Sequence, residues 1–384
     1  MNKTKVCIIT EETIPPIQRF SLTLRLAETL GKECQVHLVA IGRNSSTDYL
    51  PKNVWFHPIE VKGWDLFSLR QRIRANIKLL RKVLKICDKH DIDLIYGWWP
   101  ISFLASIFTK TPFAVDMPEF IELMYKSFHK PFPNLMKFPL KWFQTLAAKK
   151  SKALLTESSF AIEEWRRRGV RKDKMYAIPY GVEVNFLQNT GSEGIREKYG
   201  IPSDDIVIMY HGDIGFDDGV DVLIKAVREL DVWCMIIGDG SKRYMNFLKS
   251  IANGKTIFTG WILYPKIPEY LAVCDIYVAP FRSSNYTNTT YPLKQMESMA
   301  AGKPTICSRI TAFSKVVSDG YDIKLVAPGN MSELNSAIKE LAGNRHLRDI
   351  LGKNGYNTAK EKFDWKVRVD KEIDLLKKVI KNNS

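Results

Sequence analysis

Short apolar runs alternate with helical patterns along almost the whole chain. In the first half, the runs predict strands near Val6–Ile9, Val36–Ile41, Val54–His57, Leu94–Tyr96, Phe113–Val115, Ala153–Thr156 and Met175–Ile178. In the second half, they predict strands near Ile206–Tyr210, Trp233–Ile237, Ile257–Phe258, Ile276–Ala279, Thr305–Cys307 and Lys324–Val326. The segments between them have helical spacing, as at Leu22–Leu30 and around Leu66–His90. Two successive β-α-β series predict two parallel sheets, each covered by helices on both faces.

Turn residues interrupt this alternation in the stretch IPYGVEVNFLQNTGSEG. We therefore expect an N-terminal Rossmann-like domain over 1–185 and a C-terminal one over 186–360. A final helix over 361–384 is expected to cross back to the first domain. The predicted fold class is α/β, with two Rossmann-like domains whose parallel sheets face each other across a cleft. Ligands of such sheets bind beyond the carboxyl ends of the strands.

The composition is that of a soluble globular protein, with 45% hydrophobic and 26% charged residues. Six cysteines without a C-x-x-C pair predict neither a zinc site nor a disulfide framework, and they fit a reducing cytoplasm. The start MNKTKVCIIT runs directly into a strand pattern, so no signal peptide is expected. No apolar stretch is long enough to span a bilayer. These features predict a cytoplasmic location.

The positive charge lies mostly in the first half. The chain has a formal net charge of +15, and its first 185 residues hold 30 Lys and Arg against 18 Asp and Glu. Residues 69–90 form a helical pattern with eight basic residues and one acidic residue. Its apolar stripe consists of Ile73, Ile77, Leu80, Leu84 and Cys87.

A second basic segment, residues 124–152, mixes lysine with aromatic side chains. Basic amphipathic and aromatic segments of this kind predict contact with an anionic membrane surface. The alternative is that the stripe of residues 69–90 faces the sheet and the lysines are only solvated. Nucleic acid is not expected, because no RNA- or DNA-binding motif accompanies the charge.

The stretch IVIMYHGDIGFDDGVDVLIKAV, residues 206–227, has the layout of a phosphate-binding turn between a strand and a helix. Gly212 would let a ligand approach the backbone closely. However, the turn carries Asp213, Asp217 and Asp218, which would repel a phosphate. Asp217 or Asp218 is a good N-cap for the helix that follows. The alternatives are that the aspartates only cap this helix, or that phosphate binds to N–H groups and to nearby cations.

The stretch YPLKQMESMAAGKP is the second candidate for ligand contact. Pro292 is predicted to open a helix that ends at Gly302. Lys294 then lies in the first turn, where the backbone attracts anions, and Glu297 follows three residues later on the same face. This spacing suits a cation for a diphosphate and a carboxylate for ribose hydroxyls. The alternative is an exposed ion pair on a surface helix.

Four segments resemble the two-domain, GT-B-fold retaining glycosyltransferases of the family 4 type. YAIPYGVEVNF is similar to the family's vIPNGVD…F, and YHGDIGFDDGVDVLIKA is similar to yvGrl…KGvdvLieA. IIGDGSKRYMNFL with TGWILYPKIPEYLAVCDIYVAPF resembles ivGdGp…L and flGwv…elpeylaaaDvfvlPs. YPLKQMESMAAGKPTI is very close to sPLKllEyMAaGkPvi. These segments cover most of residues 175–310, whereas the first half resembles the family only in layout.

The resemblance implies particular site residues. Expected donor contacts are Gly212, Asp213, Asp218, Arg282, Thr289, Thr290, Pro292, Leu293, Lys294 and Glu297, with Lys242 and Arg243 as further cations near the phosphates. Expected catalytic residues are Lys294, Glu297 and Asp116, the last of which follows the strand at 113–115 and has helix capping as its alternative role. On the acceptor side we expect Arg19 and Glu119, with Glu11 and Glu12 as further candidates. The alternative for residues 10–21 is a plain loop between strand and helix.

The sequence departs from the family at three donor positions. Asp213 and Asp218 stand where the family has Arg and Lys, and Thr289 stands where it often has a first Glu. The loop after the first strand also lacks the family's two glycines. These departures put the donor, or the activity itself, in doubt.

The predicted function is a retaining, metal-independent hexosyltransferase that uses a UDP- or GDP-sugar and no cofactor. Its acceptor would be a lipid-linked or cell-envelope glycan at the inner face of the cell membrane. In such enzymes, N–H dipoles and cations stabilise the leaving diphosphate in place of a metal. The alternatives are a non-catalytic relative that acts as a binding or scaffold subunit, and an isomerase of the same fold that acts on nucleotide sugars.

Overall fold

The computed structural model describes residues 3–14, 22–42, 53–61, 69–117, 120, 134–188, 191 and 194–382, and the side chains of 12–14, 69 and 134–137 are not part of this description. The chain forms two compact units. Unit 1 comprises Met1–Ile121, Pro133–Ile178 and Arg368–Ser384, and unit 2 comprises Glu122–Phe132 and Pro179–Val367. The change of unit at Ile178 precedes the boundary expected at residue 185, and the last segment belongs to unit 1.

Unit 1 contains a parallel sheet of seven strands in the order β3-β2-β1-β4-β5-β6-β7. The strands are β1 (Lys5–Ile14), β2 (Gln35–Gly42), β3 (Val54–Ile59), β4 (Leu94–Trp98), β5 (Phe113–Asp116), β6 (Ala153–Thr156) and β7 (Met175–Ala177). Each apolar run predicted as a strand in the first half forms one of them. Most are almost wholly buried, because helices cover both faces of a parallel sheet.

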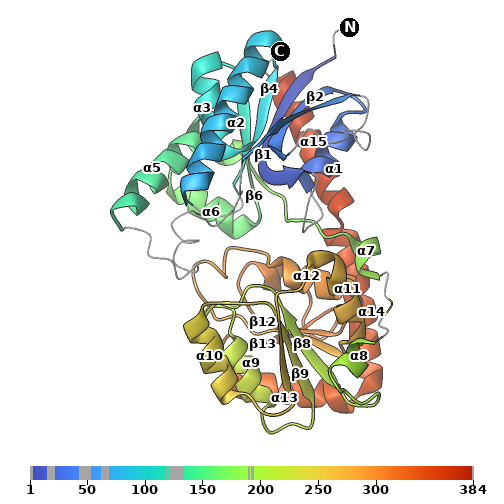
Figure 1. Ribbon diagram of the computed structural model, residues 1–384. Coiled ribbons are helices and arrows are strands. Elements are labelled where there is room, and N and C mark those ends of the chain that lie inside the picture. Colours follow the sequence, from blue (N-terminus) through green and yellow to red (C-terminus); the bar gives the residue numbers. More distant parts are fainter. Residues whose placement is uncertain are drawn as a thin grey trace. The chain divides into compact units, whose positions relative to one another are not determined.

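Helices lie on both sides of this sheet (Figure 1). They are α1 (Leu22–Leu30), α2 (Leu69–Lys89), α3 (Trp99–Thr109), α5 (Asn134–Lys150), α6 (Ser159–Arg167) and α15 (Trp365–Lys381). Helices α1 and α15 lie on one side, and α2, α3 and α5 lie on the other. Within the described ranges, every helix is too short or too polar to cross a bilayer.

Helix α2 turns a different stripe to the sheet from the one that the sequence pattern suggested. The buried residues of α2 are Ala75, Leu79, Val83 and Ile86. Ile73 and Ile77 are 52% and 47% exposed, and the other members of the predicted stripe are only partly buried. The small Ala75 made the true stripe look less apolar than its neighbour. The alternative in which the predicted stripe faces the sheet is therefore wrong for Ile73 and Ile77.

Unit 2 contains a parallel sheet of six strands in the order β10-β9-β8-β11-β12-β13. The strands are β8 (Val207–His211), β9 (Trp233–Ile237), β10 (Thr256–Gly260), β11 (Ile276–Ala279), β12 (Thr305–Ser308) and β13 (Lys324–Val326). All six strands predicted in the second half are present. The expected fold class of two Rossmann-like α/β domains with parallel sheets is confirmed.

The helices of unit 2 also form two layers (Figure 1). They are α7 (Val184–Gln188), α8 (Ile195–Lys198), α9 (Val220–Val227), α10 (Lys242–Ile251), α11 (Ile267–Val273), α12 (Leu293–Ala300), α13 (Met331–Gly343) and α14 (Arg345–Thr358), followed by one π-helical turn at Ala359–Phe363. Helices α9, α10 and α13 pack together on one side, and α7, α11, α12 and α14 on the other. The stripe predicted for the helix after Gly212, namely Val220, Leu223, Ile224 and Val227, is buried in the core.

Each sheet has one point at which the strand order reverses. In unit 1 it lies between β1 and β4, and in unit 2 between β8 and β11. Connections leave these two neighbouring strands in opposite directions, so a crevice opens beyond their carboxyl ends, and ligands of open α/β sheets bind there. The topology alone therefore marks the loops after β8 and β11, and those after β1 and β4, as candidate binding sites.

Candidate active site

The turn after β8 comes very close to its neighbours at Gly212. Gly212 has φ +124°, which side chains rarely allow, and a Cβ atom there would lie 3.0 Å from Nζ of Lys294. Gly238, which follows β9, is packed equally closely, because a Cβ atom there would lie 1.9 Å from the Gly212 carbonyl oxygen. Both glycines are therefore required, and they leave backbone accessible beside a lysine.

Lys294 reaches this turn from the start of α12. Pro292 is the N-cap residue of the helix, and Lys294 lies in the first turn, as the sequence predicted. Its Nζ lies 2.7 Å from Oδ1 of Asp218 and 2.5 Å from the Tyr210 hydroxyl. The ammonium also lies over the rings of Tyr210 and Phe281, at 4.6 and 5.1 Å from their centroids. The lysine is thus held by one carboxylate and two aromatic faces at the switch point of unit 2.

Asp218 has a different role from the predicted N-cap. Helix α9 begins after Gly219, which is its N-cap, and no side chain caps it. The Asp218 carboxylate instead accepts a hydrogen bond from the Gly215 amide at 2.9 Å and contacts Lys294. The capping prediction for Asp217 or Asp218 is wrong because the left-handed Gly219 (φ +69°) places both aspartates too early in the turn.

The Tyr210 hydroxyl links Asp213 and Asp218 within the turn. It lies 2.6 Å from the Asp213 carbonyl oxygen and 2.9 Å from Oδ1 of Asp218. Burial, together with Asp218, raises the pKa of Tyr210 well above its ordinary value, so the hydroxyl keeps its proton. Asp213 therefore takes part in the turn through its backbone. The sequence analysis had not singled out Tyr210, because a tyrosine inside a strand resembles any other core residue.

Glu297 pairs with a histidine that the sequence analysis also missed. Its Oε2 lies 2.8 Å from Nε2 of His211, and both residues are buried. His211 is the last residue of β8 and directly precedes Gly212, so its position beside the turn was the available signal. The ring of Tyr277 meets the imidazole edge-on, with centroids 5.3 Å apart. Among the described residues, the buried His211 Nδ1 has no hydrogen-bond partner.

The guanidinium of Arg282 is paired with the buried carboxylate of Asp221. Its two terminal nitrogens each lie 2.8 Å from an oxygen of Asp221, which is only 4% exposed. Burial alone would raise the pKa of Asp221, but hydrogen bonds from Arg282 and Tyr244 bring it below its usual range. Arg282 also donates to the Phe216 carbonyl at 2.8 Å. It therefore holds the turn in place, and its contact with a donor phosphate stays a prediction.

The threonines before α12 belong to a tight turn. The Thr289 hydroxyl donates to the carbonyl of Asn285 or Tyr286, each at 3.0 Å, and the Thr290 hydroxyl to that of Tyr286 at 3.3 Å. Leu293 opens α12, while Lys242 and Arg243 are exposed at the start of α10. The contact of these residues with a donor stays a prediction.

In unit 1, Asp116 ends β5 and is bonded to the C-terminal helix. Its Oδ2 lies 2.5 Å from Nη2 of Arg368, which also contacts Glu372 at 3.1 Å. The Tyr96 hydroxyl donates to the same Glu372 at 2.6 Å. Asp116 thus anchors α15. The predicted Arg19 and Glu119, and the side chain of Glu12, lie outside the described residues, whereas Glu11 is bonded to α2.

Two protein families match the chain in succession. Residues 21–186 match the model described as Glycosyltransferase Family 4, and residues 191–358 match that of Glycosyl transferases group 1. With the two parallel sheets and the switch-point site described above, these matches place the chain among the GT-B-fold glycosyltransferases of the group 1 type. The family suggested by its motifs is confirmed.

Individual relatives agree with this assignment. An uncharacterized glycosyltransferase of Methanocaldococcus jannaschii is 26% identical over 293 residues, which cover 72% of this chain and 80% of the relative. The phosphatidyl-myo-inositol mannosyltransferase of Mycobacterium leprae is 27% identical over 214 residues, 53% of each chain. The structure of Anabaena HepE with UDP and glucose has a TM-score of 0.74 at 16% identity and covers 98% of this chain and 100% of its own. The protein is a glycosyltransferase.

Proposed function

We propose that this glycosyltransferase moves a hexosyl group from a UDP- or GDP-sugar to a lipid-linked or cell-envelope glycan, with retention, at the cytoplasmic face of the membrane. The observation that carries the donor assignment is Lys294, which lies against Gly212 at the switch point of unit 2. Glu297 follows one turn later on the same helix. In support, the related Anabaena structure contains UDP and glucose.

The proposed chemistry follows from this arrangement. The diphosphate lies against the Asp213 amide, directly after Gly212, and binds Lys294, whose contact strengthens as negative charge builds up on the leaving group. Glu297, oriented by His211, accepts hydrogen bonds from the ribose hydroxyls. In unit 1 we propose Asp116 as the catalytic residue, because it ends β5 at the carboxyl edge of that sheet. A donor phosphate oxygen takes the proton of the acceptor hydroxyl, which then attacks from the face that the leaving group vacates.

The donor site is tested with nucleotides and one lysine variant. UDP or GDP should raise the melting temperature of the wild-type chain, and Lys294→Ala should abolish that shift. Turnover should fall about a hundred- to thousandfold, which corresponds to the loss of about 2.7–4 kcal/mol of transition-state stabilisation. Lys339→Ala, an exposed change on α13, is the matched control. Near wild-type turnover in Lys294→Ala would refute this placement of the phosphate.

Retention is tested on the product. The anomeric proton coupling of the product, read by NMR before it equilibrates, should show the same configuration as the donor sugar. Addition of EDTA should leave the rate unchanged if N–H groups and Lys294 alone stabilise the diphosphate. An inverted product, or a rate that disappears with EDTA and returns with a divalent cation, would contradict the proposed mechanism.

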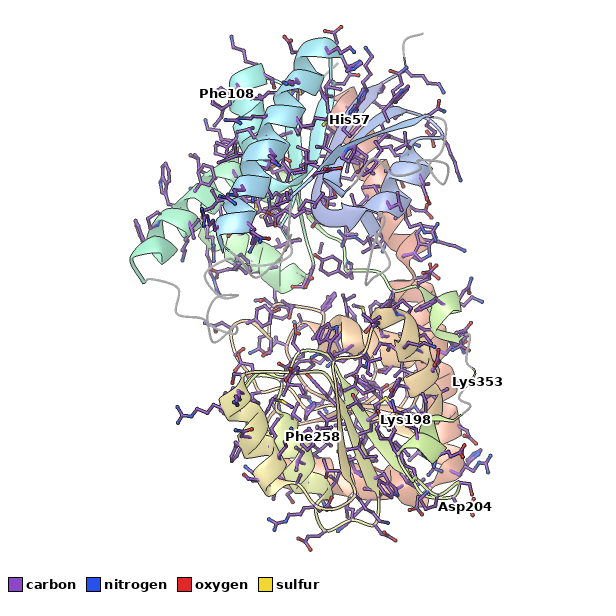
Figure 2. All side chains as sticks on the ribbon, in the orientation of Figure 1. His57, Phe108, Lys198, Asp204, Phe258 and Lys353 are labelled. Atoms are coloured by element: carbon purple, nitrogen blue, oxygen red, sulfur yellow. The ribbon has the colours of Figure 1, made fainter. Side chains whose placement is uncertain are left out.

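The membrane assignment rests on helix α2. Ile73 and Ile77 are exposed on it, and Arg74, Arg81 and Lys85 are exposed beside them. Elsewhere in unit 1, Phe108 of α3 is 67% exposed (Figure 2), and Phe138 and Trp142 of α5 are 77% and 60% exposed. Exposed apolar side chains next to basic ones favour the boundary of an anionic bilayer.

Vesicle binding tests this surface. Each basic residue near an anionic surface contributes about 1 kcal/mol, so changing Arg74, Arg81 and Lys85 to Ser should weaken binding by about a hundredfold. Changing Lys198, Lys339 and Lys353 to Ser removes the same charge from unit 2, where Figure 2 labels two of these lysines, and should have little effect. Equal losses in both variants would show that only the total charge matters.

The alternative function is a scaffold subunit that kept the fold but lost the chemistry. The observation that favours it is the ion pair between Asp218 and Lys294, which leaves the expected phosphate cation already neutralised. A scaffold would show no melting shift with any uridine or guanosine diphosphate. The same nucleotide screen therefore separates the two functions.

A further inference from the structure

The carboxyl ends of β1 and β4 in unit 1 carry a connected polar network. The carboxylate of Glu11 accepts hydrogen bonds from Arg72 at 3.0 Å and from the Asn76 amide at 2.6 Å. The indole N–H of Trp98 donates to Oδ1 of the same Asn76 at 2.9 Å. Two strand ends and the first turns of α2 thus meet in one cluster, and its four members (Glu11, Arg72, Asn76 and Trp98) are all partly exposed.

This cluster flanks the switch point of unit 1. Strand β1 contributes Glu11 from an irregularity in its pairing with β2, where Ile9 pairs with Val39 and Thr13 with Ile41. Extra residues of this kind re-aim side chains and are frequent next to active sites. Gly97, directly before Trp98, has φ +114°, and a Cβ atom there would lie 2.2 Å from the Ile9 carbonyl oxygen. The backbone is therefore shaped to present these groups where ligands of such sheets bind.

The charged side chains at these strand ends are paired with one another. Arg72 of α2 is paired with Glu11, and on the other side of the sheet Arg368 of α15 is paired with Asp116 and Glu372. The five ionised groups carry three negative charges and two positive ones. Arg368 is only 4% exposed in its side chain, so a ligand does not reach it. A phosphate or carboxylate would have to displace Glu11 from Arg72, whereas uncharged hydroxyls could share the existing donors and acceptors.

We propose that the cluster of Glu11, Arg72, Asn76 and Trp98 is the acceptor subsite and that it selects an uncharged sugar. This inference rests on the proposed function. Glu11 and Asn76 offer planar, adjacent hydrogen-bonding atoms that match neighbouring hydroxyls of a pyranose. The Arg72 guanidinium lies over the ring of Trp98, 5.9 Å from its centroid, and the opposite face of the ring offers an apolar surface for the C–H face of the sugar. The pairing of Arg72 with Glu11 discriminates against phosphorylated and uronic-acid sugars.

The test is saturation-transfer NMR on the full chain with small probes. The neutral probes are methyl α-glucopyranoside, methyl α-mannopyranoside and methyl α-galactopyranoside, and the anionic probes are glucose 6-phosphate and glucuronate. We expect at least one neutral probe to bind at least tenfold more tightly than both anionic ones, and Trp98→Leu to abolish that binding. Equal or tighter binding of an anionic probe by the wild-type chain would overturn the inference.

Charge-changing variants test the cause of the selectivity. Glu11→Gln leaves Arg72 unpaired and should shift the neutral-to-anionic preference at least tenfold toward the anionic probes. The double change Glu11→Gln with Arg72→Gln should restore the neutral preference. If Glu11→Gln does not fold, Arg72→Gln leaves Glu11 unpaired and should shift preference at least tenfold toward glucosamine, which is cationic. Unchanged preferences in the folded variants would overturn the inference.

The same samples separate this inference from the proposed function. UDP and GDP melting shifts are measured on each variant, because donor binding lies in unit 2 and should survive changes in unit 1. If UDP or GDP still raises the melting temperature but no sugar is preferred, only the acceptor subsite is overturned. Loss of nucleotide binding in the wild-type chain would overturn the proposed function together with it.

Discussion

Asp218→Asn tests whether the acidic turn limits donor binding. Asp218 lies 2.7 Å from Nζ of Lys294, and their side chains are only 19% and 15% exposed, so the pair is poorly screened. A phosphate oxygen bound on the far side of Nζ would lie roughly 5 Å from the carboxylate. Two like charges at that separation repel by about 3 kcal/mol at an effective dielectric constant of about 20. Allowing for solvent, Asn should tighten UDP or GDP binding by about 1–2 kcal/mol, or roughly tenfold.

Asparagine is the appropriate replacement because it keeps part of the turn. Its amide oxygen can still accept the hydrogen bond from Gly215, whereas a lysine there would face Lys294 with no carboxylate between them. Calorimetry with bare nucleotide gives the affinity, and a melting curve checks the fold. Asp204→Asn, at an exposed turn position before β8 (Figure 2), makes the same charge change away from Lys294. Affinities of the two variants within twofold of each other would show that Asp218 does not face the phosphate.

Three further outcomes follow from buried charged and titratable groups. Arg282→Ala should lower the free energy of unfolding by about 3 kcal/mol, because it leaves Asp221 buried without its main partner; an effect below 1 kcal/mol in urea unfolding would contradict this. Burial lowers the pKa of both His37 and His57 to about 4, so stability should fall as pH drops from about 6.5 toward 4, by about 2 kcal/mol at pH 5 for the contacting pair. The difference in the free energy of unfolding between pH 7 and pH 5 should be smaller when both histidines are changed to Gln. An unchanged difference would refute the assignment. His211→Phe should raise the donor KM more than it lowers kcat, His211→Gln should restore most of the affinity, and a fall in kcat alone would contradict an orienting role.

Local pattern was enough to predict the strands of both sheets. Apolar β-branched runs need burial on both faces, and β-α-β alternation permits few arrangements other than parallel sheets. The placement of Lys294 and Glu297 was also local, because Pro292 fixes where the helix begins and helical spacing puts the two residues on one face. The motifs also identified the family, and the matches over residues 21–186 and 191–358 confirm it.

Tertiary structure decided which groups those residues meet. Asp218 resembled a helix cap in the sequence, but the left-handed Gly219 moves the start of the helix, and the carboxylate turns to Lys294, 76 positions away. Nothing local in the sequence indicated that Arg282 pairs with Asp221, which lies 61 positions away. The sequence determined secondary structure and motif identity because both depend on neighbours a few residues away. Partners of charged side chains depend on which loops the strand order brings together, so only the folded chain determined them.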